Sequence, residues 1–250
     1  MLLFLSVPLI ALLYRAAPSQ IWQNLAMPQV RQAISLSLTT TLISTVLVVI
    51  LGTPLAYLLA KGRVPLRQAV DTLVDLPAVL PPAVAGVALL MAFGRRGLLG
   101  GLLAEWEIYI AFTPVAVIMA QIFVASPFFF KSATTGFAAI DEELEQAAAL
   151  DGADGWQIFR HITAPLARNG LLGGAVMAWA RALGEFGATI IFAGNYPGRT
   201  QTMPLAIYIG FELDLNIALT LSVILMGAAF LVLLVVKGVL DRDVGMMRGA

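Results

Sequence analysis

Long apolar runs constrain this chain more than any other feature of its sequence. The clearest run spans residues 34–60 and ends against Lys61. A helix needs about 20 apolar residues to cross the roughly 30 Å hydrocarbon core of a bilayer, so this segment is expected in lipid. The whole chain agrees with that solvent. Its mean hydropathy is +0.90 and only 12% of its residues are charged, against roughly 25% in soluble domains.

Five further apolar runs predict an all-α polytopic membrane protein with about six transmembrane helices. The runs cover residues 2–14, 76–93, 108–130, 166–193 and 217–236. Residues 1–33 are assigned to an N-terminal transmembrane helix and its outer connection. A cleaved signal peptide is the alternative for the first run, because the small residues Ala16 and Ala17 follow it.

The third run begins with closely spaced prolines, Pro77, Pro81 and Pro82. Proline lacks an amide hydrogen and fits best in the first turn of a helix. The regular helix is therefore predicted to start at Pro81 and Pro82. Non-helical backbone before it needs protein or water to satisfy its polar groups.

Basic residues are unevenly distributed among the predicted connections. If the amino terminus lies inside, nine of them fall on the inner side and five on the outer side, and all three lysines are inside. Because cytoplasmic loops carry the excess of Lys and Arg, both termini are predicted to be cytoplasmic. The inner set is Lys61, Arg63, Arg67, Lys131, Arg160, Arg168, Lys237, Arg242 and Arg248.

Charge and residue content argue against several classes of function. The formal net charge is zero, so no nucleic-acid partner is expected. The chain has no cysteine and one histidine, His161, which we interpret as a surface residue of a polar stretch. Neither a metal site nor a cofactor site is therefore predicted, and no catalytic residue is assigned.

The fifth run contains two charged residues, Arg181 and Glu185, four positions apart. In one helix they would share a face. A charge within a span is costly, on the order of 2.5 to 3.5 kcal/mol for Arg by insertion scales, so both should face protein or water. They predict either a polar translocation path or a buried ion pair between helices. A stripe of small residues on this helix predicts close packing, and it consists of Gly170, Gly174, Ala178 and Ala182.

The one long polar insertion covers residues 131–165. It begins with a predicted helix from Ile140 to Gly152, rich in acids at its start. Asp154 then caps a second short helix, with Gln157 completing a capping box. Trp156, Phe159 and Ile162 follow one another at three-residue intervals and are therefore predicted to lie along one side of that helix. The element either lies on lipid headgroups or docks into a groove on a soluble partner.

A family resemblance rests on this insertion. The segment from Gln146 to Gly152, then nine residues, then Ile162-Thr-Ala-Pro165 resembles the cytoplasmic signature loop of ABC importer permeases, with Gln146 in place of Glu and Ala164 in place of Leu. The resemblance implies a type I permease fold, in which this loop couples to an ATPase subunit. The implied coupling residues are Glu145, Gln146, Ala147, Ala148, Gly152, Ala153, Asp154, Trp156, Phe159, Ile162 and Pro165.

A second block, from Arg181 to Ala206, is similar to the molybdate permease subgroup, with sulfate and tungstate permeases close to it. This implies a permease core over residues 34–240, with coupling loop 131–165, and a cytoplasmic tail over 241–250. It further implies import of a tetrahedral oxyanion, with molybdate favoured, across the inner membrane of a bacterium or archaeon. The implied partners are a second copy of the chain, two ATP-binding subunits, an external oxyanion-binding protein and membrane lipid.

The sequence has no G-x-x-x-x-G-K-[ST] phosphate loop, so a partner is expected to hydrolyse ATP. Two other classes stay open. A secondary transporter would use an intramembrane carboxylate such as Glu185 to carry protons. A membrane enzyme would need a polar cluster near the interface, where Glu105 and Glu107 are the nearest outer acids.

Overall fold

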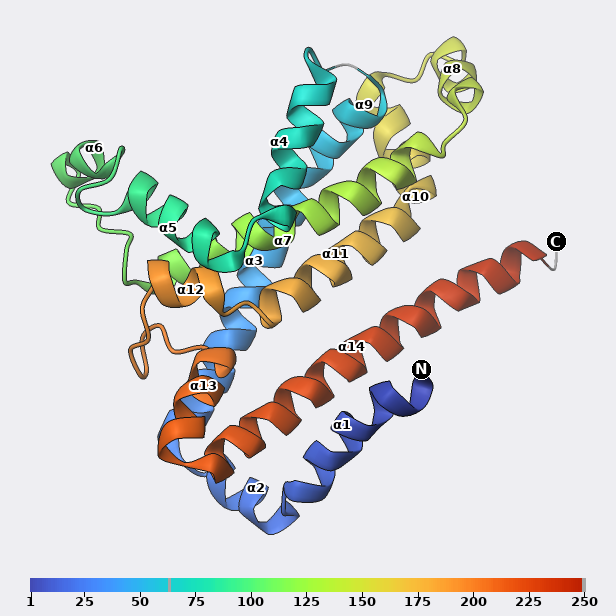
Figure 1. Ribbon diagram of the computed structural model, residues 1–250. Coiled ribbons are helices and arrows are strands. Elements are labelled where there is room, and N and C mark those ends of the chain that lie inside the picture. Colours follow the sequence, from blue (N-terminus) through green and yellow to red (C-terminus); the bar gives the residue numbers. More distant parts are fainter. Residues whose placement is uncertain (63, 249–250) are drawn as a thin grey trace. The chain divides into compact units, whose positions relative to one another are not determined.

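The computed structural model describes residues 1–62 and 64–248, with side chains as far as Leu234. Within these residues every regular element is helical, which confirms the predicted all-α class (Figure 1). The orientation argument used Arg63 and the side chains of Lys237, Arg242 and Arg248, which lie outside the described part. The elements are α1 (Leu2–Arg15), α2 (Pro18–Leu25), α3 (Pro28–Ala60), α4 (Arg67–Val79), α5 (Pro82–Phe93), α6 (Gly100–Glu105), α7 (Pro114–Ala138), α8 (Glu142–Leu150), α9 (Gly155–Ile158), the π-helix η1 (Phe159–Thr163), α10 (Ala164–Leu166), α11 (Arg168–Leu183), α12 (Gly187–Phe192), α13 (Met203–Leu213) and α14 (Leu215–Arg248).

Three of the described helices are long and apolar enough to cross a bilayer: α3, α7 and the part of α14 up to Leu234. Two bent pairs reach the same criterion only when each pair is taken together. Helices α1 and α2 meet at 70°, and α4 and α5 meet at 116°. Length and composition therefore give three to five spans in the described residues, against the six continuous runs expected from the sequence.

The bend between α4 and α5 follows from the prolines. Leu80 and Pro81 each precede a proline, and both have extended backbone, with ψ of 136° and 133°. The ring of a following proline disfavours helical backbone, so the chain turns there. Pro82 then occupies the first turn of α5, which confirms the predicted start. The sequence did not predict that the preceding residues form a helix of their own, α4, with Pro77 inside it.

The fifth apolar run is not one helix, so the prediction of a continuous span over 166–193 is wrong. Helix α11 has 16 residues and ends at Leu183, and α12 starts at Gly187. Between them, Glu185 accepts a hydrogen bond from the Ala188 amide at 2.8 Å. A carboxylate that binds the amides of a first turn stabilises a new helix start, so the chain restarts there instead of continuing.

The described chain divides into two compact units. The first contains Met1–Ile43, Pro81–Gln121 and Leu183–Val232, and the second contains Ser44–Leu80, Ile122–Ala182 and the chain from Leu233. In the first unit α5 and α12 lie side by side (Figure 1). A Cβ on Gly86 would lie 2.8 Å from the carbonyl oxygen of Ala188, so glycine is what lets these two backbones meet.

The second unit has its own apolar core, in which α7 packs against α11 and the second half of α3. Its largest members are Phe129 and Phe137, both fully buried. The small residues predicted to form a packing stripe on α11 are in this contact: Gly174 faces the Phe129 backbone, and Ala178 and Ala182 are buried. The close packing predicted for this helix is therefore confirmed, and the core holds the base of the polar insertion in place.

Candidate functional site

The first half of the polar insertion is helix α8. Asp141 caps it by accepting a hydrogen bond from the Glu143 amide at 3.0 Å, and three glutamates stand in its first turn, where they complement the helix dipole. The helix ends before Gly152, as predicted. Gly152 has φ +89°, its amide donates to Ala149, and the Ala153 amide donates to Ala148. This pattern is a Schellman motif, which requires a residue that adopts left-handed backbone cheaply.

The second half starts with the predicted capping box. The Gln157 amide donates to Asp154 Oδ1 and the Asp154 amide donates to Gln157 Oε1, each at 2.8 Å. The helix that follows does not stop after a few residues. It passes through η1 and α10 to within one residue of α11. Because α7 also continues to Ala138, the insertion over 131–165 is a helical hairpin, with the two predicted short helices meeting at Gly152.

The three residues predicted to share one face of the second helix differ in burial. The Trp156 ring stacks on Phe159 with centroids 5.8 Å apart, and 66% of Trp156 stays exposed. Phe159 turns inward, where the centroid of its ring lies 5.4 Å from that of Tyr57 and 6.3 Å from that of Phe137. The π-helical turn explains the difference, since its wider turn rotates the residues after Phe159 relative to an α-helix. Ile162 is half-buried as a result.

The outer face of this hairpin is mostly uncovered. Leu150 is 89% exposed, and Ala147, three residues before it, lies on the same side of α8 and is also exposed. Exposed apolar side chains at a defined turn are typical of an interaction surface. We call the exposed predicted residues and their apolar neighbours the coupling surface: Leu144, Gln146, Ala147, Leu150, Gly152, Asp154, Trp156 and Pro165.

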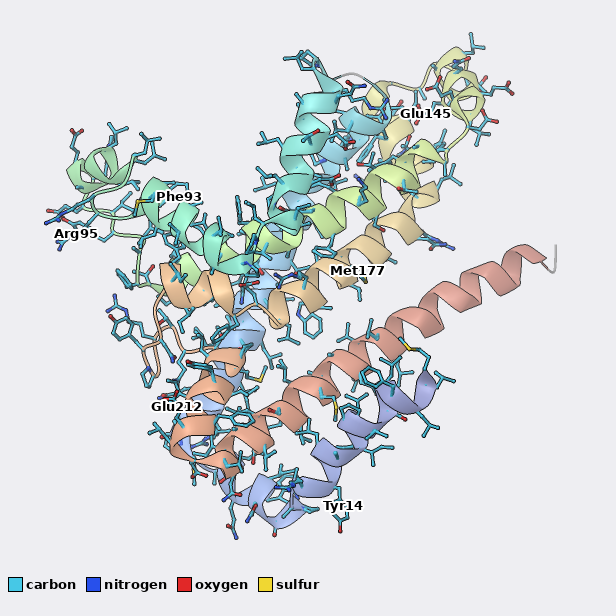
Figure 2. The ribbon with its side chains drawn as sticks, viewed as in Figure 1. Tyr14, Phe93, Arg95, Glu145, Met177 and Glu212 are labelled. Atoms are coloured by element: carbon cyan, nitrogen blue, oxygen red, sulfur yellow. The ribbon has the colours of Figure 1, made fainter. Side chains whose placement is uncertain are left out.

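Glu145 belongs to the inner face, although it was predicted among the coupling residues. Its side chain is labelled in Figure 2, and its Oε2 lies 2.9 Å from Lys61 Nζ. Its Oε1 accepts a hydrogen bond from the Thr163 hydroxyl at 2.8 Å. A cavity of about 270 Å³ beside this pair is lined by Tyr57, Gln146 and Ile158, among other residues. Ala148 and Ala153 are half-buried on the same hairpin.

Sequence reasoning missed the residues that contact the inner face of the hairpin, which are Lys61, Tyr57 and Thr163. Lys61 was used only as a charge that fixes orientation, and Tyr57 was one apolar residue of a long run. Thr163 was not singled out at all. A single sequence could have suggested only that Lys61 ends α3 and needs an acid nearby. Which acid it meets depends on how the insertion folds back.

Arg181 and Glu185 occupy different local structures. Arg181 lies in the last turn of α11 and is half-buried, whereas Glu185 lies beyond the end of that helix and is 1% exposed. The four-residue spacing therefore does not place them on one continuous helix. Their role as a translocation path or as an ion pair stays a prediction. Glu185 has a defined local role, which is to bind the Ala188 amide at the start of α12.

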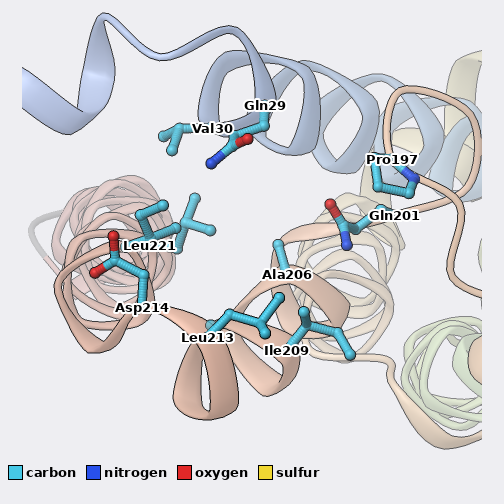
Figure 3. A pocket seen from close by; sticks show the side chains of 11 residues that line it. Gln29, Val30, Pro197, Gln201, Ala206, Ile209, Leu213, Asp214 and Leu221 are labelled. Carbon is cyan, nitrogen blue, oxygen red and sulfur yellow. The ribbon is translucent and has the colours of Figure 1, made fainter.

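A second candidate site is a pocket of about 270 Å³ in the first unit (Figure 3). Its floor is apolar, with Ile209 and Leu213 from α13, and Gln29, Gln201 and Asp214 supply polar groups at the rim. The charged group among these lining residues is the carboxylate of Asp214, which would repel a bound oxyanion. Gln29 and Gln201 are the lining side chains that could donate hydrogen bonds.

Comparison with known proteins gives consistent matches. A family model described as a binding-protein-dependent transport system inner membrane component matches residues 49–245. The chain is 41% identical to the molybdenum transport system permease protein ModB of Mycobacterium bovis, over 93% of this chain and 88% of that protein. It is 34% identical to the sulfate transport system permease protein CysW of Synechococcus elongatus, over 89% of this chain and 78% of that protein.

Solved structures agree on the fold. The chain superposes on a bacterial ABC transporter that imports alginate with a TM-score of 0.76 at 19% identity, covering 96% of this chain and 91% of that chain. The score is 0.62 at 19% identity on the methionine ABC transporter MetNI, covering 94% and 98%. At these identities the likeness is one of fold.

Proposed function

This chain belongs to the family of binding-protein-dependent transport system inner membrane components, and on that premise we propose that it is the membrane permease of an ATP-driven molybdate importer. Its fold is that of the ABC importer permeases expected from the resemblance. The proposed substrate rests on the 41% identity to a molybdenum permease over 93% of the chain.

Sulfate and tungstate are the competing substrates because both are tetrahedral dianions like molybdate. The sulfate permease relative supports sulfate less strongly, at 34% identity. We propose that selection among these anions falls largely to an external binding protein, so the permease needs to pass a dianion instead of recognising one. Arg181, a half-buried basic residue in the last turn of α11, is the proposed contact along the path, and a buried ion pair with Glu185 is the alternative role.

The coupling surface is the proposed contact with the ATPase subunits. Two features present it rigidly: the Schellman motif at Gly152 and the capping box of Asp154 with Gln157. Both are local backbone constraints, so α8 and α9 keep their mutual angle while Leu150 and Trp156 stay exposed. An apolar helical face fits a groove on a partner. ATP hydrolysis is then the work of that partner, as the missing phosphate loop suggests.

The remaining parts of the assembly are proposed from the family. Two copies of the chain form the path, an oxyanion-binding protein delivers substrate from outside, and lipid surrounds the apolar helices. The hairpin of α8 and α9 then lies on the cytoplasmic side together with both termini, as the distribution of lysine predicts.

The test is uptake by the purified permease reconstituted in vesicles with its ATPase subunits and binding protein. Radiolabelled molybdate should enter only when ATP is present, and excess unlabelled molybdate should compete better than sulfate. Tungstate is measured in parallel. Uptake that continues without ATP and follows a proton gradient would favour a secondary transporter. Sulfate competing better than molybdate would reassign the substrate.

A further inference from the structure

A nearly buried ion pair ties the coupling hairpin to the end of α3. Lys61 Nζ and Glu145 Oε2 are 2.9 Å apart, and their side chains are only 7% and 14% exposed. Lysine and glutamate are rarely this buried unless they are paired. Lys61 directly follows the last residue of α3, and Glu145 lies in the first turn of α8. The pair therefore joins two elements that are far apart in the sequence.

The second oxygen of the same carboxylate binds a third element. The Thr163 hydroxyl donates to Glu145 Oε1 at 2.8 Å, and Thr163 is fully buried at the end of η1. One carboxylate thus connects α3, α8 and η1. Both of its oxygens have a partner, which is the condition under which a buried charge is tolerated.

An aromatic contact repeats the connection one turn earlier on α3. The centroid of the Tyr57 ring lies 5.5 Å from that of Phe137 and 5.4 Å from that of Phe159, and both pairs are T-shaped. Tyr57 and Lys61 are four residues apart, so they share one face of the chain where α3 ends. That face contacts the hairpin through a ring and through a charge. The two contacts differ in kind, since one packs aromatic rings together and the other holds two opposite charges 2.9 Å apart.

A second Lys–acid pair in the same unit shows what is particular about the first. Lys131 Nζ lies 2.6 Å from Asp75 Oδ2, yet these side chains are 67% and 38% exposed. Solvent screens an exposed pair, and such pairs contribute little. Lys131 lies on α7 and Asp75 on α4, so this pair joins neither α8 nor α9 to another element. It provides a matched control.

We propose that Lys61 is a positioning residue that holds the coupling hairpin at a fixed place on α3 through Glu145 and Thr163. The proposal rests on the proposed function, because the hairpin matters only if it receives force from an ATPase. A displacement of α8 would then move the end of α3 with it. Glu145 acts inside the chain, whereas Ala147 and Leu150 of the coupling surface are exposed.

The main variant is the neutral double change Lys61→Met with Glu145→Gln. It leaves no buried charge without a partner, so it should fold and bind the ATPase subunits as the parent does. Molybdate transported per ATP hydrolysed should fall at least about fivefold, the lower end of measured allosteric couplings. Lys61→Arg keeps the charge and should keep most of the coupling. Lys131→Met, the control, should leave transport per ATP unchanged.

A distance measurement tests the positioning without any transport. The chain has no cysteine, so Leu58→Cys and Leu150→Cys introduce the two sites for spin labels, one on α3 and one at the end of α8. In the permease alone, the distance distribution should be narrow for the parent and for the Lys131→Met variant. It should broaden in the neutral double variant.

The outcomes separate the two proposals. An unchanged distribution in the neutral double variant, or parental transport per ATP, overturns the positioning role of Lys61. Broadening in a protein whose parent does not import molybdate supports the positioning role and rejects the proposed substrate. Broadening together with loss of transport per ATP supports both.

Discussion

Gly170 on α11 lies so close to Gly136 on α7 that a Cβ built on Gly170 would be 2.8 Å from the Gly136 Cα and 2.9 Å from the Ser132 carbonyl oxygen. The Ser132 hydroxyl stabilises the same contact by donating a hydrogen bond to the Gly170 carbonyl oxygen at 2.8 Å. The two helices therefore touch backbone to backbone, as small residues allow in membrane proteins.

This contact predicts a sharp difference between neighbouring glycines. Gly170→Ala must push backbone apart and should cost on the order of 1 to 3 kcal/mol. Gly173→Ala meets only the Ser132 hydroxyl at 3.6 Å, so it should be neutral or slightly stabilising through helix propensity. Thermal unfolding of the purified permease in detergent measures both. Equal behaviour of the two variants would contradict the packing of α7 on α11.

Gly152 should be required for a conformational reason. Its φ of +89° is strained for any side chain, although nothing lies within 4 Å of an added Cβ. Gly152→Arg should leave membrane abundance normal while the ATPase subunits no longer co-purify and uptake stops. Gly155→Arg is the control, because its surroundings are equally open and its φ is ordinary. If the Gly152 variant kept both uptake and bound ATPase, α8 and α9 would instead be a membrane-surface element.

The coupling surface should be sensitive to charge. Leu150→Asp places a carboxylate on the exposed apolar face, and its desolvation in a docked complex should weaken ATPase binding. Leu98→Asp is the matched control, since Leu98 is 86% exposed and Leu150 is 89% exposed, and Leu98 lies in the other unit. Co-purification of the ATPase subunits is the readout. A loss of co-purification caused equally by both variants would point to general destabilisation.

Glu185 should be replaceable by an acceptor and not by a hydrocarbon. Glu185→Gln keeps an oxygen for the Ala188 amide, whereas Glu185→Leu leaves that buried amide without its acceptor and should cost about 1 to 3 kcal/mol. Thermal unfolding distinguishes the two. A Gln variant as unstable as the Leu variant would show that the charge of Glu185 matters more than the hydrogen bond.

The predicted ion pair with Arg181 has its own test. If the two charges neutralise each other, Arg181→Met alone should cost on the order of 3 to 5 kcal/mol, and adding Glu185→Leu should recover much of that loss. The assembled fraction in size-exclusion chromatography measures it. Single variants that assemble as well as the parent would favour a water-filled path around Arg181.

The capping and patterning rules account for what the sequence by itself determined. Apolar runs predicted helices α3, α7 and α14, because burial in lipid requires length and hydropathy and both are local properties. The Gly152 bend and the capping box of Asp154 were also predictable, since each is satisfied by residues within five positions.

The tertiary structure decided the features that depend on distant partners. Helix α5 can lie against α12 because Gly86 leaves room for the Ala188 carbonyl. Glu145 turned inward because folding brings Lys61 and Thr163 to it. A sequence pattern records which groups need a partner. Which partner each one receives depends on the packing of elements far apart in the chain, where the cost of burying a charge selects the arrangement.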